Sequence, residues 1–228
     1  MSRSFNIVKI SYGIIKFPFL IFAITLVLVS ITNFTLNNIF NAGGIMTSAS
    51  IANIIASYLF VISAIWPIYF YKRIMSLGAT RKEYYSGIIF TYVAMAAIFS
   101  LFNTVWIPFE NSFLSENIFY YNIVEIFNWD QYGTLGSFLY QFFAYLLIVS
   151  FITLLFSCFN HMIGILLYIV LAVGIPISVS IGELRNALGK GLSIVFSNPS
   201  IWIGLALNIA FILIFFYSGW WFTKRREV

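Results

Sequence analysis

The chain has 228 residues, of which 61% are hydrophobic and only 8% are charged, and its formal net charge is +5. Charged residues make up roughly 25% of a soluble domain because they cover its surface, so this composition excludes an ordinary water-soluble protein. The cations flank apolar runs, as membrane anchors do, which argues against a nucleic-acid-binding protein.

Six apolar runs are long enough to cross a bilayer. A spanning helix needs about 20 such residues, because the hydrocarbon core is about 30 Å thick and each helical residue rises about 1.5 Å. A spanning β-strand would instead alternate over about 10 residues. The sequence therefore predicts an all-α polytopic membrane protein, with a single transmembrane domain over residues 1–228 and uncharged spans at residues 17–36, 50–71, 88–106, 136–157, 163–181 and 201–222.

Residues 1–16 form a separate element before the first span. Apolar side chains recur there at helical spacing, and polar ones, including two lysines, occupy another stripe: Phe5, Val8, Tyr12 and Ile15 against Ser2, Asn6, Lys9, Gly13 and Lys16. This pattern predicts an amphipathic elbow helix lying at the headgroup interface. A basic segment that only fixes the topology is the open alternative.

The loop over residues 72–87, between the second and third spans, is short and basic. It is expected to be helical on both sides of a break at Gly78. Thr80 can cap a helix that begins at Arg81, with Glu83 as the reciprocal partner of a capping box. The alternative is a charged turn that only follows the positive-inside rule.

Two other loops contain apolar residues that a solvated linker would lack. The acidic, aromatic loop over residues 107–135 predicts a short helix within 118–127, lying on the interface or dipping into the bundle. The segment over residues 182–199 has leucines at helical spacing and predicts a second interfacial helix. An aromatic belt without a role in transport is the alternative for both.

The distribution of cations predicts the orientation, because Lys and Arg near helix ends are retained in the cytoplasm. With the amino terminus inside, the outer loops hold only Arg185 and Lys190 but most of the acids. Ten of the twelve cations are then inside: Arg3, Lys9, Lys16, Lys72, Arg73, Arg81, Lys82, Lys224, Arg225 and Arg226. Both termini are therefore expected to be cytoplasmic.

Catalytic and metal-binding patterns are missing from the sequence. The six spans contain no charged residue, which disfavours an ion-coupled carrier. The Gly189-Lys190 pair is followed by Gly191, so no phosphate-binding loop of the ATPase type is present. His161 lacks a nearby carboxylate, and the single Cys158 cannot form a disulfide within the chain. We expect no catalytic residue, metal site or cofactor in this chain.

The segment Ser76-Leu77-Gly78-Ala79-Thr80-Arg81-Lys82-Glu83-Tyr84-Tyr85-Ser86-Gly87 resembles the G-x-[ST]-R-K-E-[FY]-x-x-G stretch between spans two and three of ABC-2-type transporter permeases. The layout of an elbow helix, six spans and a basic loop after span two is also similar. Within that family, the chain looks most like small Gram-positive permeases that export, or confer resistance to, antimicrobial or amphipathic peptides, including phenol-soluble-modulin exporters. The long acidic loop between spans three and four departs from the family layout.

The resemblance implies a permease subunit, not an enzyme, in a bacterial plasma membrane, with a second permease chain as partner. The permease would export an apolar or amphipathic substrate, driven by a separate cytosolic ATPase that binds ATP and Mg²⁺. Movement of the ATPase would pass through a coupling helix made of Thr80, Arg81, Lys82, Glu83, Tyr84 and Tyr85. The two tyrosines are expected to be the buried anchors of that interface.

A path for such a substrate is expected to be lined by uncharged polar and aromatic residues, for which the candidates are Ser57, Tyr58, Ser178 and Asn208. Two other functions are compatible with the sequence. One is an immunity or sensing subunit that binds peptide without moving it, and the other is a passive channel or membrane scaffold.

Overall fold

The computed structural model describes residue 24 and residues 46–113, 118–159 and 161–226. Five helical stretches in these ranges are long and apolar enough to cross a membrane: Ile51–Ser76, Arg81–Glu110, Trp129–Ser157, Met162–Ser180 and Ile201–Arg225. They confirm five of the predicted spans and a multi-pass membrane protein. The elbow helix over residues 1–16 and, apart from residue 24, the span over residues 17–36 lie outside the described residues.

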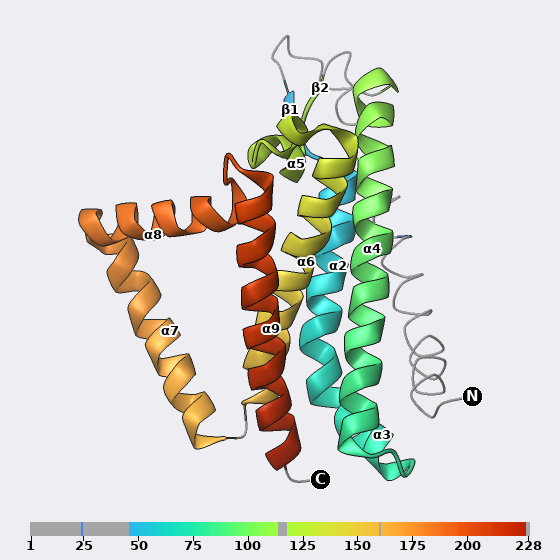
Figure 1. Cartoon of the computed structure of the whole chain (residues 1–228), viewed down its shortest axis with the longest axis vertical. Coiled ribbons are helices and arrows are strands. Elements are labelled where there is room, and N and C mark those ends of the chain that lie inside the picture. Colours follow the sequence, from blue (N-terminus) through green and yellow to red (C-terminus); the bar gives the residue numbers. More distant parts are fainter. Residues whose placement is uncertain (1–23, 25–45, 114–117, 160, 227–228) are drawn as a thin grey trace.

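Four of the five spans pack side by side as a bundle with α6 in contact with all the others (Figure 1). Its members are α2 (Ile51–Ile65) continued by α3 (Tyr71–Ser76), then α4 (Arg81–Phe113), α6 (Gly133–Ser157) and α9 (Ile201–Arg225). Small and polar residues such as Ala144, Ser150 and Thr153 are buried along α6. Such residues let helices approach closely in a membrane, where apolar burial alone gives no preference for protein over lipid.

The second span contains a π-helical turn, Trp66–Phe70, between α2 and α3. Pro67 lies within this turn and lacks the N–H that a regular α-helix would need. A π-turn accommodates this loss by widening the backbone locally. Trp66 and Pro67 are buried, so the irregular turn is covered by the rest of the bundle.

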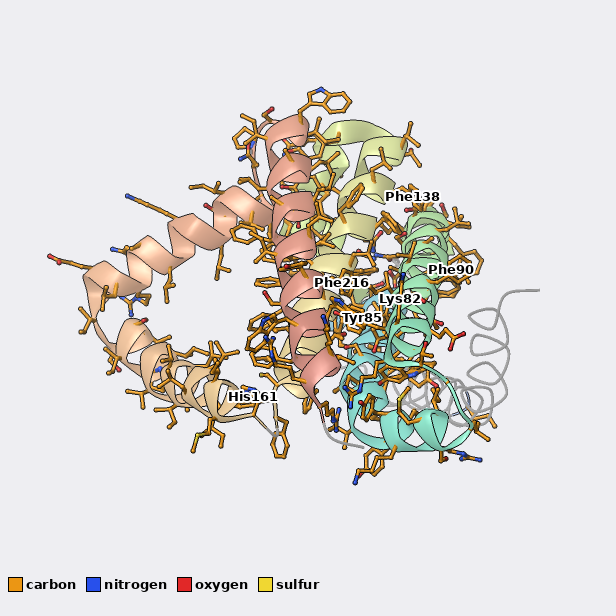
Figure 2. The ribbon with its side chains drawn as sticks, turned by 60° about the horizontal axis from the view of Figure 1, so that its bottom comes forward. Lys82, Tyr85, Phe90, Phe138, His161 and Phe216 are labelled. Atoms are coloured by element: carbon orange, nitrogen blue, oxygen red, sulfur yellow. The ribbon has the colours of Figure 1, made fainter. Side chains whose placement is uncertain are left out.

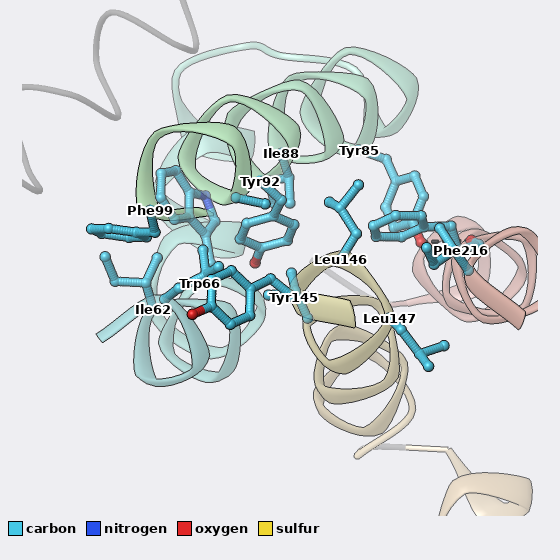
Figure 3. Close-up of a cluster of buried hydrophobic side chains, with 14 of the residues drawn as sticks. Ile62, Trp66, Tyr85, Ile88, Tyr92, Phe99, Tyr145, Leu146, Leu147 and Phe216 are labelled. Carbon is cyan, nitrogen blue, oxygen red and sulfur yellow. Dashed lines mark hydrogen bonds between the residues drawn. The ribbon is translucent and has the colours of Figure 1, made fainter. Parts of the chain in front are cut away.

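Aromatic rings fill the middle of the bundle (Figure 3). The Trp66 ring meets the Tyr92 ring edge-on, with centroids 6.2 Å apart, and Phe60 meets Tyr145 in the same way at 6.0 Å. Edge-to-face contacts are favourable because the positive edge of one ring faces the negative face of the other. These pairs join α4 and α6 to the second span.

The end of the bundle opposite α3 differs from the prediction of one helix within residues 118–127. Strand β2 (Ile118–Tyr121) pairs in parallel with strand β1 (Met46–Ala49), and only α5 (Ile123–Ile126) is helical. A short 3-10 turn, Trp129–Tyr132, then leads into α6. The prediction failed for the first half because the β-branched and aromatic residues of β2 favour a strand when a partner is available. That partner lies about seventy residues away in the sequence.

The remaining helices, α7 (Met162–Ser180) and α8 (Gly182–Phe196), form an arm beside the bundle (Figure 1). Helix α8 confirms the helix expected within residues 182–199 and runs across the direction of the spans. All residues of α7 are described, and only Gly164 among them is buried. Helix α7 is therefore long and apolar enough to cross a membrane, but the rest of the described chain leaves it almost uncovered.

The junction between α8 and α9 is fixed by side chains from the bundle. Trp129 Nε1 donates to the carbonyl of Phe196 at 2.5 Å, and Tyr140 Oη and Asn208 Nδ2 donate to the carbonyl of Val195 at 2.9 and 3.0 Å. The last carbonyls of a helix have no partner within the helix. These three donors supply partners and hold the end of α8 against α6 and α9.

Candidate functional site

The turn between α3 and α4 lies at the same end of the bundle as the carboxyl end of α9 (Figure 1). We call this end the basic end, because it carries Lys72, Arg73, Arg81, Lys82, Lys224, Arg225 and Arg226. Gly78 ends the turn after α3 with a φ of +81°, a left-handed conformation that a residue with a Cβ rarely adopts. The predicted break at Gly78 is thus confirmed.

The start of α4 is closed by the predicted capping box. The Glu83 carboxylate accepts from the Thr80 N–H and from the Thr80 hydroxyl, both at 2.8 Å. The Glu83 N–H in turn donates to Thr80 Oγ1 at 3.2 Å. Two amide groups that a helix start leaves without partners are thereby satisfied, so the helix has a defined beginning at Arg81.

Tyr84 and Tyr85 lie inside the chain's own core. Their exposed fractions are 2% and 5%. The Tyr84 hydroxyl donates to the carbonyl of Trp66 at 3.4 Å, and the Tyr85 hydroxyl donates to the carbonyl of Phe216 at 2.6 Å. Figure 3 shows Tyr85 and Phe216 facing each other between α4 and α9. The expected role as anchors for a partner therefore does not fit this arrangement, because neither ring is open to one.

The carboxyl end of α9 is bound to the same turn. Arg81 donates to the carbonyl of Lys224 at 2.6 Å, and Arg226 donates to the carbonyl of Pro67 at 2.5 Å. The Arg226 guanidinium also lies over the Tyr71 ring, 4.6 Å from its centroid. Cations near the carboxyl end of a helix are favourable because the carbonyls there carry partial negative charge. Helices α3, α4 and α9 are thus joined at one point.

The part of the turn that remains accessible is small and basic. Leu77 is 64% exposed, and Thr80 and Lys82 are also exposed. Figure 2, in which the basic end comes forward, shows Lys82 on α4. Of the six predicted coupling residues, Thr80, Arg81, Lys82 and Glu83 therefore lie at the surface or half-buried, whereas the two tyrosines face inward.

The four predicted path residues are not brought together within the described chain. Ser57 is exposed on α2 and its hydroxyl donates to the carbonyl of Ile54, whereas Tyr58 is buried. Ser178 lies on α7, which stands apart from α2 (Figure 1). Asn208 is buried where α9 meets α8, and its Oδ1 has no hydrogen-bond partner among the described residues. A path that uses all four would need a second chain or another arrangement of α7.

A buried polar cluster at the end opposite the basic end was not predicted. Asn103 and Asn122 exchange two amide hydrogen bonds, at 3.2 and 2.8 Å. Asn122 also donates to Ser50 Oγ at 3.1 Å and accepts from the Val124 N–H at 3.0 Å. This cluster connects α4 with the start of α2 and the start of α5. The two asparagines, nineteen residues apart, gave no sequence signal.

Glu110 corrects the prediction that residues 107–135 form a loop throughout. It lies in α4 with an exposed fraction of 1%, rather than in a solvated loop. One carboxylate oxygen accepts from the Ile51 N–H at 3.4 Å, at the start of α2. A carboxylate there is stabilised by the partial positive charge of a helix amino terminus. The predicted loop began too early because α4 continues through Pro108 to Phe113.

Cys158 and His161 show no catalytic arrangement. Burial raises the pKa of the Cys158 thiol, so the thiol stays neutral and poorly nucleophilic near neutral pH. The His161 ring packs edge-on against Trp221 and Phe222. In the described parts of the chain, no group of three or more His, Cys, Asp or Glu residues is placed to hold a metal ion.

Comparisons with protein-family models, with curated proteins and with solved structures found no match to this chain. The resemblance to ABC-2-type permeases thus rests on the motif at residues 76–87 and on the layout of the spans.

Proposed function

We propose that this chain is the membrane-spanning permease subunit of an ATP-driven exporter, in which a separate ATPase docks on the turn between α3 and α4. The observation that carries the proposal is a capped, exposed and basic turn that is bonded directly to three spanning segments. A turn that served only to orient the chain in the membrane would need its positive charges but not these hydrogen bonds. The cargo is an apolar or amphipathic molecule, such as a peptide or a lipid.

These hydrogen bonds define how movement of the turn would be transmitted to the spans. Leu77 and Lys82 provide the contact surface, and the capping box keeps the start of α4 rigid. Tyr84 then connects α4 to the second span, and Tyr85 connects it to α9. Displacement of the turn would therefore move three spans together. In this proposal the tyrosines transmit force within the permease instead of anchoring the ATPase.

The charge of the turn suits an acidic docking surface. Lys82 is exposed beside the tip of the turn. Complementary charge mainly accelerates and orients association, whereas a buried apolar anchor contributes most of the affinity. Leu77, at the tip, is the exposed apolar residue available for that role.

A second permease chain, identical or homologous, completes the proposed transporter. Exposed apolar side chains lie along α7, for example Ile165, Ile169 and Val173. Ser178 and the unpartnered oxygen of Asn208 would line a path only if such a chain supplied the missing walls. ATP and Mg²⁺ would be bound by the ATPase and not by this chain.

The test is affinity purification of the full-length tagged chain from the membranes of its source cells in a mild detergent. We expect an ATPase to co-purify and the eluate to hydrolyse Mg-ATP. The double variant Leu77→Ser/Lys82→Glu should lose at least tenfold of the bound ATPase, because it removes the apolar tip and reverses a charge. An acidic residue near a helix start is tolerated, so α4 should still form.

The matched control is Leu188→Ser/Lys190→Glu, which makes the same two changes on exposed residues of α8. It should retain the ATPase at the level of the unmodified chain. Purification of the unmodified chain without any ATPase would contradict the proposal and would favour a passive channel or scaffold. ATPase binding without peptide or lipid movement in reconstituted vesicles would instead favour a sensing or immunity subunit.

A further inference from the structure

The basic end has a large excess of positive charge. Seven cations lie there, and Glu83 is the acidic residue among the described residues that accompanies them. Its carboxylate already accepts two hydrogen bonds from Thr80. The opposite end is different, because Glu110, Glu125, Asp130 and Glu183 there outnumber Arg185 and Lys190.

The cations of three elements are held close to one another. Arg81 of α4 contacts the backbone of Lys224, and Arg226 lies on Tyr71, the residue next to Lys72. Arg225 covers the Trp221 ring with its guanidinium 3.7 Å from the centroid. Like charges gathered at one end of the bundle repel one another, and anions that bind among them relieve the repulsion.

The position of these cations along the spans points to the kind of anion. They lie where the apolar stretches Ile51–Ser76 and Ile201–Arg225 end. Trp221, whose ring contacts Arg225, is half-buried and is of a type that concentrates at the level of lipid headgroups. Cationic side chains at that depth face the phosphate groups of the membrane rather than bulk water.

We propose that the basic end binds the headgroups of anionic phospholipids through Lys72 and Arg73 of α3 and Lys224 and Arg225 of α9. All four side chains are exposed and form no ion pair among the described residues. The site lies on the flanks of the two helices, whereas the proposed ATPase surface is the tip at Leu77 and Lys82. The inference does not depend on the proposed function.

The test uses the purified full-length chain equilibrated with mixed micelles of detergent and equal parts of phosphatidylglycerol and phosphatidylcholine. Native mass spectrometry then counts the bound lipids of each kind. The unmodified chain should retain phosphatidylglycerol severalfold over phosphatidylcholine. Lys72→Gln/Arg73→Gln should lower that preference at least twofold at low salt, because each cation near an anionic surface adds to the attraction.

The control Arg185→Gln/Lys190→Gln removes one lysine and one arginine from α8, at the end where acids predominate. It should leave the preference unchanged. An equal loss in both double variants, or an equal uptake of the two lipids by the unmodified chain, would overturn the proposal. Loss of ATPase association by Lys72→Gln/Arg73→Gln with unchanged lipid preference would also overturn it and would assign these cations to the protein partner.

Discussion

Tyr85 combines a hydroxyl that needs a partner with a ring that fills the space between α4 and α9. Its hydroxyl is bonded to the carbonyl of Phe216, and its ring lies 5.4 Å from that of Trp220. The residue is therefore sensitive in two separable ways. Substitution by phenylalanine removes only the hydrogen bond, whereas substitution by a smaller residue also removes the packed ring.

Tyr85→Phe should lower the free energy of unfolding by about 1 kcal/mol, and Tyr85→Ala should lower it by roughly 3 kcal/mol or more because a cavity is left. The measurement is the midpoint of thermal unfolding in detergent. Unfolding is monitored by the reaction of the Cys158 thiol with a fluorescent maleimide. Tyr217→Phe, at an exposed position on α9, is the control and should have no effect. Equal midpoints for Tyr85→Ala and the unmodified chain would show that the ring is not packed here.

Cys158 should react slowly in the folded protein at neutral pH, from whichever side the reagent arrives. The thiol is buried, and burial raises its pKa, so the reactive thiolate is scarce and its fraction increases only as the pH rises. Unfolding should increase the labelling rate by more than tenfold, as measured by mass spectrometry over time. Rapid labelling of the folded protein at pH 7 would contradict the buried position.

At the scale of elements, short-range interactions form the start of α4 and long-range ones form the opposite end of the bundle. The capping box joins two residues three positions apart, so it was visible in the sequence. The Asn103–Asn122 pair and the β1–β2 pairing join segments that are distant in the chain. Their stability therefore depends on the whole bundle being assembled.

Asn122→Ala should destabilise the protein by roughly 2 kcal/mol or more, because it removes several hydrogen bonds and leaves Asn103 buried without its partner. Asn186→Ala, at an exposed position of α8, provides the matched control and should change little. The measurement is again the thermal midpoint in detergent. In the double variant Asn103→Ala/Asn122→Ala the losses should be less than additive, since the pair acts as one unit. Strict additivity would mean that the two amides do not interact.

At the scale of the whole molecule, the basic end and the α8 arm are expected on opposite sides of the membrane. The spanning helices separate these two parts, and the positive-inside rule predicts that the basic end is cytoplasmic. A chain inserted the other way would expose these cations to the outside.

The topology prediction is tested in a Cys158→Ser background, with Leu77→Cys at the basic end and Asn186→Cys on α8, both at exposed positions. An impermeant maleimide should label Asn186→Cys in intact cells and Leu77→Cys only after permeabilisation. The opposite pattern would invert the orientation, and labelling of both in intact cells would contradict the described order of spans.

The sequence by itself determined the five described spans, the break at Gly78 and the capping box, because each depends on neighbouring residues. A spanning helix satisfies its own backbone hydrogen bonds, so its existence follows from local hydrophobicity. Only the tertiary structure decided that Tyr84 and Tyr85 face the core, that Glu110 is buried, and that residues 118–121 form a strand. Each of these outcomes requires a partner far away in the chain, and sequence periodicity specifies which face of a helix is apolar but not what that face contacts.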